Sequence, residues 1–340
     1  MTIFVRALFS FIFAVSLPPW NGETKRMPGT RTNGLALTGE VAFCRSKPIL
    51  ARVSSSNTIA LYRLGGGVWK KYDLIPAADP YDLTWSLDGS SLAWMNSDGP
   101  AVVWRKGKEY QIAGNNWSDS SKNVTSISLS PNGERFAIGR LGRAEEHIVG
   151  SGLLRSYRMG DSEKGVAVAY SPIGDLLAGG RNLLLAPVRQ SRRVRELSFT
   201  RYISTLAANP NGDTIAALEF GSRLEIQMYT TVSKPKAVWQ GAGYPNDLTW
   251  SPNGKLVAMV LGANEKAKEP ETLNRVVILR SSDWRVIATF RLPYSTGGGL
   301  QFDYSSRLFS ATLPNEQGGT QTLFWSTVTW QQTKVSLFGG

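Results

Sequence analysis

Residues 250–258 read Trp-Ser-Pro-Asn-Gly-Lys-Leu-Val-Ala, and variants of this phrase recur along the chain. The proline fixes the backbone at the second position of a turn, and asparagine tolerates the third position. The glycine accepts the left-handed conformation that sends the chain back as a hairpin. The flanking residues are apolar or alternate with polar ones, as in buried and half-buried strands. The phrase therefore predicts two antiparallel strands joined by a tight turn.

Five copies of the phrase are clear, and residues 43–51 and 302–310 carry two degenerate copies. The clear copies share an aromatic or apolar residue before the turn, turn residues, and an alanine in the second strand. Their marker positions are Trp85, Gly89, Pro131, Gly133, Pro172, Gly174, Pro210, Gly212, Trp250, Pro252 and Gly254. The copies are about 40 residues apart, which is the period of a propeller blade with four strands.

We therefore predict an all-β fold, a seven-bladed β-propeller of four-stranded antiparallel blades, over residues 36–340. Two further strands follow each phrase, and the last strand of the chain, within 333–338, is expected beside the first blade. The rings of Trp85 and Trp250 are expected between neighbouring blades. The predicted blades cover 36–76, 80–113, 123–160, 164–199, 201–240, 245–293 and 297–340.

The phrase at 250–258 resembles the repeat of the TolB-like, or PD40, β-propellers, which are relatives of the WD40 class. The resemblance extends over residues 36–340 and implies a propeller. Propellers of this kind serve as scaffolds, periplasmic adaptors and peptidase accessory domains, so the resemblance implies architecture more than function. The chain has no Gly-His or Trp-Asp dipeptide, unlike regular WD40 proteins, and no room for the extra amino-terminal domain of TolB.

The composition agrees with a folded chain rich in strands and turns. Of 340 residues, 42% are hydrophobic and 19% charged, with 34 Gly, 17 Pro and 11 Trp. Aromatic residues favour strands, and Gly and Pro favour turns. The single cysteine, Cys44, and the single histidine, His147, exclude a disulfide framework and a zinc site built from several Cys or His side chains.

The first residues are typical of a targeting segment. In residues 1–22, Arg6 precedes an apolar run that ends near Ala14-Val15-Ser16, which resembles a secretory signal peptide. Residues 23–35 read as a polar linker. We expect an exported protein, periplasmic or secreted, if the leader is cleaved, and a cytoplasmic one otherwise. No later apolar run is long enough to span a bilayer.

Motifs that carry chemistry are missing from the sequence. We find no nucleophile elbow, P-loop, EF-hand loop or dinucleotide fingerprint. His147 follows Glu145-Glu146 in an expected connection, and we favour a locally bonded strand-edge histidine over a catalytic base. Cys44 is expected to be a small buried hydrophobe. We therefore predict no enzyme, cofactor or metal site.

An enzymatic alternative stays open. Some propeller lactonases hold calcium with carboxylates near the central channel. Asp82 and Asp247, before inner strands, and Asp303, after one, are the acids that such a site would use.

The net charge of +12 and the pI near 9.8 favour acidic partners. The densest basic run alternates as an exposed outer strand would; it contains Arg189, Arg192, Arg193 and Arg195. We therefore interpret this run as an exposed outer strand rather than as a nucleic-acid patch. An intracellular WD40-like adaptor whose basic surface docks nucleic acid or an acidic protein remains an alternative.

Long connections point to a binding face. Connections between the second and third strands and between blades open on the same face of a propeller, and the longest here are 114–123, 140–146, 261–274 and 313–321. Binding residues tend to occupy variable loops on rigid scaffolds, although long loops are also tolerated without a role. We predict a non-catalytic scaffold that binds another protein. Its expected binding residues are Trp117, Arg140, Arg143, His147, Lys266 and Lys268.

Overall fold

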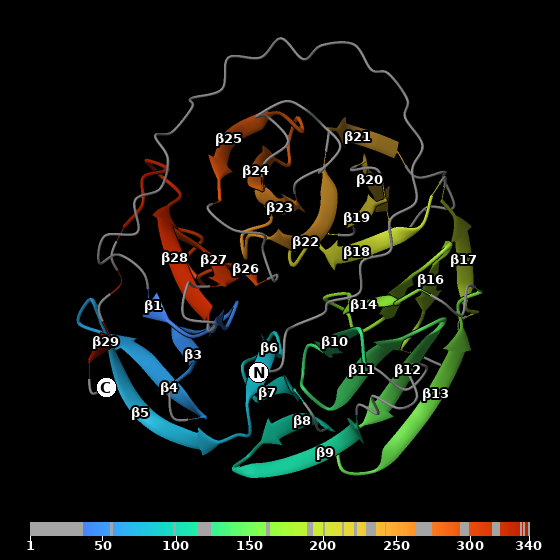
Figure 1. The fold of residues 1–340 in the computed structure, drawn as a ribbon. Helices are drawn as coiled ribbons and strands as arrows, with labels where there is room; N and C mark the ends of the chain where they lie inside the picture. The colour runs from blue at the N-terminus through green and yellow to red at the C-terminus, as the bar shows by residue number, and fades with distance from the viewer. Residues whose placement is uncertain are drawn as a thin grey trace, which may run out of the picture.

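The fold, seen in a computed structural model, is a ring of β-sheets around a central axis (Figure 1). None of the described residues forms a helix that is long and apolar enough to cross a membrane. The structure describes residues 37–54, 57–97, 100–114, 124–160, 164–188, 193–199, 201–212, 214–220, 223–228, 236–241, 243–262, 274–292, 299–314, 320–333, 335 and 337–338.

Five of the sheets are built from four consecutive antiparallel strands each. One contains β6 (Pro80–Trp85), β7 (Ser91–Asn96), β8 (Pro100–Arg105) and β9 (Lys108–Gly114). The next contains β10 (Ser126–Leu129), β11 (Arg135–Arg140), β12 (Arg143–Ile148) and β13 (Gly152–Arg158). The third contains β14 (Ala167–Tyr170), β15 (Leu176–Gly179), β16 (Asn182–Ala186) and β17 (Arg195–Ser198). The fourth contains β18 (Ile203–Ala208), β19 (Thr214–Glu219), β20 (Arg223–Met228) and β21 (Lys236–Gln240). The fifth contains β22 (Tyr244–Trp250), β23 (Leu256–Gly262), β24 (Arg275–Arg280) and β25 (Val286–Arg291).

Two more sheets use strands from both ends of the chain. One has the order β26 (Leu300–Phe302), β27 (Leu308–Pro314), β28 (Thr320–Ser326) and β1 (Leu37–Thr38). The other has β2 (Val41–Phe43), β3 (Ile49–Val53), β4 (Thr58–Gly65), β5 (Val68–Pro76) and β29 (Leu337–Phe338). The first strand of each repeat lies toward the centre of the ring in Figure 1.

The structure agrees with the prediction of an all-β propeller with four-stranded antiparallel blades. The described strands form six four-stranded sheets, however, whereas seven were predicted. The sheet of β2–β5 has five strands because β29, beside the first predicted blade as expected, adds to β5 in parallel. The segment Leu37–Thr38, placed in the first blade by the prediction, instead pairs with β28. The ring is therefore closed by both ends of the chain.

The repeated phrase forms the expected turn. In the copy at 250–258, the Ser251 hydroxyl donates to Asn253 Oδ1 at 2.7 Å and accepts from the Leu256 N–H at 2.9 Å. Gly254 has a φ of 65°, a conformation in which glycine avoids the steric cost of a side chain. Three other copies also have a glycine of positive φ at this place: Gly89, Gly133 and Gly174. Gly212, at the same place in the remaining copy, does not have a positive φ. The phrase recurs because the hydroxyl of its serine bonds within the turn and its glycine adopts the positive φ that the turn needs.

The tryptophans before the turns join neighbouring sheets, as predicted. The Trp250 indole N–H donates to the Ala207 carbonyl at 3.1 Å, and the ring is 1% exposed. The Trp85 indole N–H donates to the Ala42 carbonyl at the same distance. Each bond links an inner strand to the inner strand of the preceding sheet.

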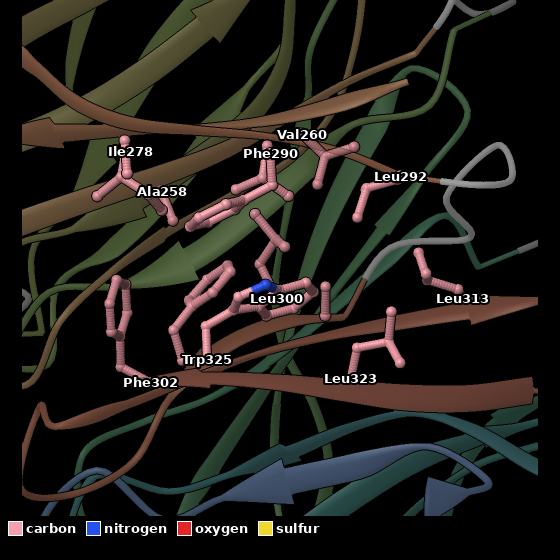
Figure 2. Close-up of a cluster of buried hydrophobic side chains, with 14 residues drawn as sticks. Ala258, Val260, Ile278, Phe290, Leu292, Leu300, Phe302, Leu313, Leu323 and Trp325 are labelled. Carbon is pink, nitrogen blue, oxygen red and sulfur yellow. The ribbon is translucent and has the colours of Figure 1, made fainter. Parts of the chain in front are cut away.

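The hydrophobic core lies between sheets rather than inside one. Among the described residues, seven clusters of buried side chains each combine residues of two neighbouring sheets. Figure 2 shows the cluster between the sheets of β22–β25 and β26–β28, where the Phe290 and Trp325 rings stack with centroids 5.2 Å apart. Burying one large apolar side chain stabilises a fold by roughly 1.5–3 kcal/mol. Each sheet is thus held mainly by its neighbours.

Candidate functional site

The acid at the start of β2 joins two inner strands. Both carboxylate oxygens of Glu40 accept hydrogen bonds from the next sheet, from the N–H groups of Asp82 at 2.9 Å and Leu83 at 2.8 Å. Asp82 has a φ of 57°, where the register of β6 against β7 shifts. Glu40 therefore satisfies donors that an irregular strand leaves outside the ladder.

Asp247 has the same role between β22 and β26. Its Oδ2 accepts from the N–H groups of Gly299 at 2.9 Å and Leu300 at 2.8 Å, and its Oδ1 accepts from Leu248 at 2.7 Å. Burial raises the pKa of Asp247, and these backbone hydrogen bonds oppose that rise. The carboxylate is occupied by backbone donors of its own and the following sheet.

The three acids considered for a metal site do not form one. Asp303 lies in the turn after β26, where its Oδ1 accepts from the N–H groups of Arg307 and Leu308 at 2.9 and 2.8 Å. Asp82 and Asp247 lie within inner strands, as the third residue of β6 and the fourth residue of β22. Within the described part of the chain, no three His, Cys, Asp or Glu side chains are grouped to hold a metal ion.

One buried arginine that the sequence did not point to makes a long-range contact. Arg45 Nη2 donates to Thr249 Oγ1 of β22 at 3.3 Å. The sheets of Arg45 and Thr249 lie on either side of the β26 sheet, so this hydrogen bond joins two sheets that are not neighbours. Burial lowers the pKa of Arg45, although Asp247 attracts its charge. Other copies have Pro, Leu or Tyr at this place, and that difference was the available signal.

Residues 140–146 are not a long connection, contrary to the prediction. Arg140 ends β11 and Arg143 begins β12, with Leu141 and Gly142 between them. Gly142 has a φ of 63°, and Leu141 forms a β-bridge with Gly165. The polar composition suggested a loop, but a tight hairpin needs only this one left-handed residue.

Three of the predicted binding residues meet at Glu145. Its carboxylate lies 3.1 Å from Arg140 Nε, 3.6 Å from Arg143 Nη1 and 3.5 Å from His147 Nε2. The nearby His147 ring, and then the hydrogen bond from Arg140, lower the pKa of Glu145 to about 2, against the effect of burial. The Arg143 side chain is 58% exposed, but those of Arg140 and His147 are 11% and 9% exposed. Of these three, Arg143 alone has a side chain that is mostly exposed to solvent.

His147 lies inside β12 and not in a connection. It pairs with Phe136 of β11 and is buried. The strand alternation places Glu145 and His147 on one face of the sheet and Glu146 on the other. This position corrects the prediction of a connection.

Glu146 is the second charged centre of this sheet, and the sequence analysis missed it. Its fully buried carboxylate accepts from Arg155 Nε at 2.8 Å, from Arg135 Nη1 at 3.4 Å and from the Tyr170 hydroxyl at 3.0 Å. Burial raises the pKa of Tyr170 well above its usual range, and the charge of Glu146 adds to that rise. Tyr170 takes the place of Trp85 and Trp250 in its repeat, so this network also joins neighbouring sheets.

The other predicted residues have mixed outcomes. Cys44 is fully buried, as expected. Arg195 begins β17, the outermost strand of its sheet, as its alternating pattern indicated. The predicted binding residues Trp117, Lys266 and Lys268 lie outside the described residues, as do Arg189 and Arg192.

No family model matches this chain, and no curated protein matches it.

Proposed function

We propose that the protein is a non-catalytic scaffold, a β-propeller that binds another protein. The observation that carries the proposal is how the inner carboxylates are used. Glu40 and Asp247 hold neighbouring sheets, and Asp303 holds a turn. Because their oxygens accept from backbone N–H groups, these acids build the ring and do not offer a set of free ligands at its centre.

The finer description belongs to the same proposal. We assign the chain to the TolB-like, or PD40, kind of propeller on the strength of the repeated phrase. We count the five-stranded sheet as a seventh blade, because core clusters on both its faces join it to the sheets on either side.

Export is also part of the proposal, supported by the sequence of residues 1–22. Mass spectrometry of the mature amino terminus tests it, with cleavage after Ser16 or a neighbouring residue as the expected result. An intact leader would favour the cytoplasmic adaptor instead.

The scaffold and the metal-dependent hydrolase differ in calcium binding. We expect titration calorimetry with calcium to give no saturable heat and the melting temperature to stay unchanged in calcium. Saturable binding that Asp247→Asn abolishes, in a variant that still folds, would overturn the scaffold proposal.

Binding itself is tested with a natural partner. We expect a protein from the source organism to form a complex of fixed stoichiometry when both purified components are mixed. Cross-linking and peptide mapping should place the contacts on the face of Arg143. Cross-links confined to β17 would move the site to the rim of the propeller.

A further inference from the structure

Two aromatic rings and a lysine meet where three sheets come together. Lys164 Nζ lies 4.9 Å from the centroid of the Tyr202 ring and 5.9 Å from that of Phe220. The two rings are 6.0 Å apart and tilted by 60°. Lys164 precedes β14, Tyr202 precedes β18 and Phe220 follows β19, so each belongs to a connection on the same face as the β11–β12 hairpin.

Backbone contacts join these connections to the hairpin. The Gly142 N–H donates to the Lys164 carbonyl at 2.9 Å, and the Tyr202 hydroxyl donates to the Gly165 carbonyl at 2.8 Å. The Phe220 N–H donates to the Tyr202 carbonyl at 2.9 Å. These hydrogen bonds therefore connect described residues at the ends of three sheets.

The described charged side chains that are exposed on this surface are all positive. The two described carboxylates here are withdrawn from solvent: Glu145 pairs with Arg140, and Glu219 is fully buried. Phe220 is 43% exposed. The exposed cations are Arg143, Arg158, Lys164, Arg181 and Arg201. We call these five cations and Phe220 the basic surface.

We propose that the basic surface binds an acidic polypeptide segment that places an apolar side chain against Phe220. This inference rests on the proposed scaffold function and names the chemistry of its partner. Positive potential attracts and orients an acidic chain, and an aromatic side chain at the centre of such a patch supplies apolar contact.

The surroundings of Phe220 favour a polypeptide over a nucleic acid. Lys164 lies over the ring, and Tyr202 packs against it at an angle. Single-stranded nucleic acids use open ring faces on which bases stack. Because this ring is partly covered by neighbours, it suits a leucine or phenylalanine side chain better than a base.

The test uses the full-length protein and a fluorescent peptide of repeated Glu-Glu-Leu, with anisotropy as the readout. We expect saturable binding that weakens as salt rises, because salt screens these charges. The triple variant Arg143→Glu, Arg158→Glu, Arg181→Glu should lose at least about tenfold in affinity. Phe220→Ser should weaken binding of this peptide but not of a poly-glutamate peptide of equal length.

A second triple variant controls for total charge. Lys70→Glu, Lys71→Glu and Lys108→Glu reverse three exposed lysines on other sheets and change the net charge equally. We expect its affinity to remain within about twofold of the unmodified protein. Equal loss in both triple variants, or tighter binding of a single-stranded oligonucleotide of the same charge, would overturn the proposal.

These failures differ from a failure of the scaffold function. A natural partner that still binds the Arg143, Arg158, Arg181 triple variant at full strength overturns the basic surface as the binding site and leaves the scaffold standing. Calcium-dependent hydrolysis by the unmodified protein would overturn the proposed scaffold function, whether or not the peptide binds. This inference would then lose its functional basis.

Discussion

At the scale of single residues, side chains between the sheets carry much of the structure. The Trp250 indole is buried among residues of two sheets and bonded to the Ala207 carbonyl. Glu145 and Glu146 are adjacent in sequence, yet each gathers its own set of cations on opposite faces of β12. The Trp250 contact crosses from one repeat to the next, whereas the cations around Glu145 and Glu146 belong to the same sheet as the two acids.

Replacing Trp250 with alanine should destabilise the fold by about 3–5 kcal/mol, because a buried ring is exchanged for a cavity. Trp250→Phe keeps most of the ring and loses the bond to Ala207, so its cost should be clearly smaller. Thermal and denaturant unfolding measure both. An unchanged melting temperature for Trp250→Ala would mean that the ring does not support the fold.

Glu145 should make stability depend on pH. Its pKa is about 2 in the folded protein and near 4.5 in an unfolded chain. A carboxyl group with a lowered folded pKa stabilises the fold fully above its unfolded pKa and loses that contribution as pH falls toward the folded pKa. The stability gap between the unmodified protein and Glu145→Gln should therefore shrink from about pH 5 to pH 2. A gap that stays constant over this range would contradict the ion-pair assignment.

At the scale of elements, the two-residue strands β1 and β29 close the ring in different ways. Leu37–Thr38 completes a sheet of three strands, and Leu337–Phe338 adds to a sheet that already has four. The loss of β1 leaves β28 as an open edge, which invites pairing with another chain. The loss of β29 leaves an ordinary four-stranded blade.

Deleting residues 1–38 should therefore lower the melting temperature more than deleting residues 337–340, and it should promote association. A protein lacking residues 1–36 is the matched control, since it keeps β1. Differential scanning calorimetry and light scattering compare the three. Equal stability of the proteins starting at residues 37 and 39 would show that β1 does not close the ring.

The sequence predicted the repeated hairpins well, because Ser-Pro-Asn-Gly fixes a turn through local bonds such as those of Ser251. It did not predict β1 in the last sheet, because two residues carry no periodic pattern and their partners, Gln321 and Thr322, lie at the far end of the chain. It misread the β11–β12 hairpin, because Arg and Glu side chains that pair with each other inside a sheet have the composition of a loop. Arg45 was missed because its partner belongs to a distant repeat.

At the scale of the whole molecule, the net charge of +12 opposes compactness. Screening this self-repulsion should raise the melting temperature as sodium chloride increases from low to physiological concentration. The Arg143, Arg158, Arg181 triple variant lowers the net charge by two per site, from +12 to +6, and its melting temperature should respond less to salt. An equal response in both proteins would mean that local ion pairs, and not total charge, set the salt dependence.

The position of Arg45 has a consequence for the whole molecule. Arg45 follows β2, and its guanidinium donates to Thr249 of β22, close to Asp247, whose charge attracts it. Asp247 in turn accepts hydrogen bonds from Gly299 and Leu300 at the start of the β26 sheet. One arginine and one carboxylate therefore connect three sheets across the place where the two ends of the chain meet, so a change at either residue should be felt in all three.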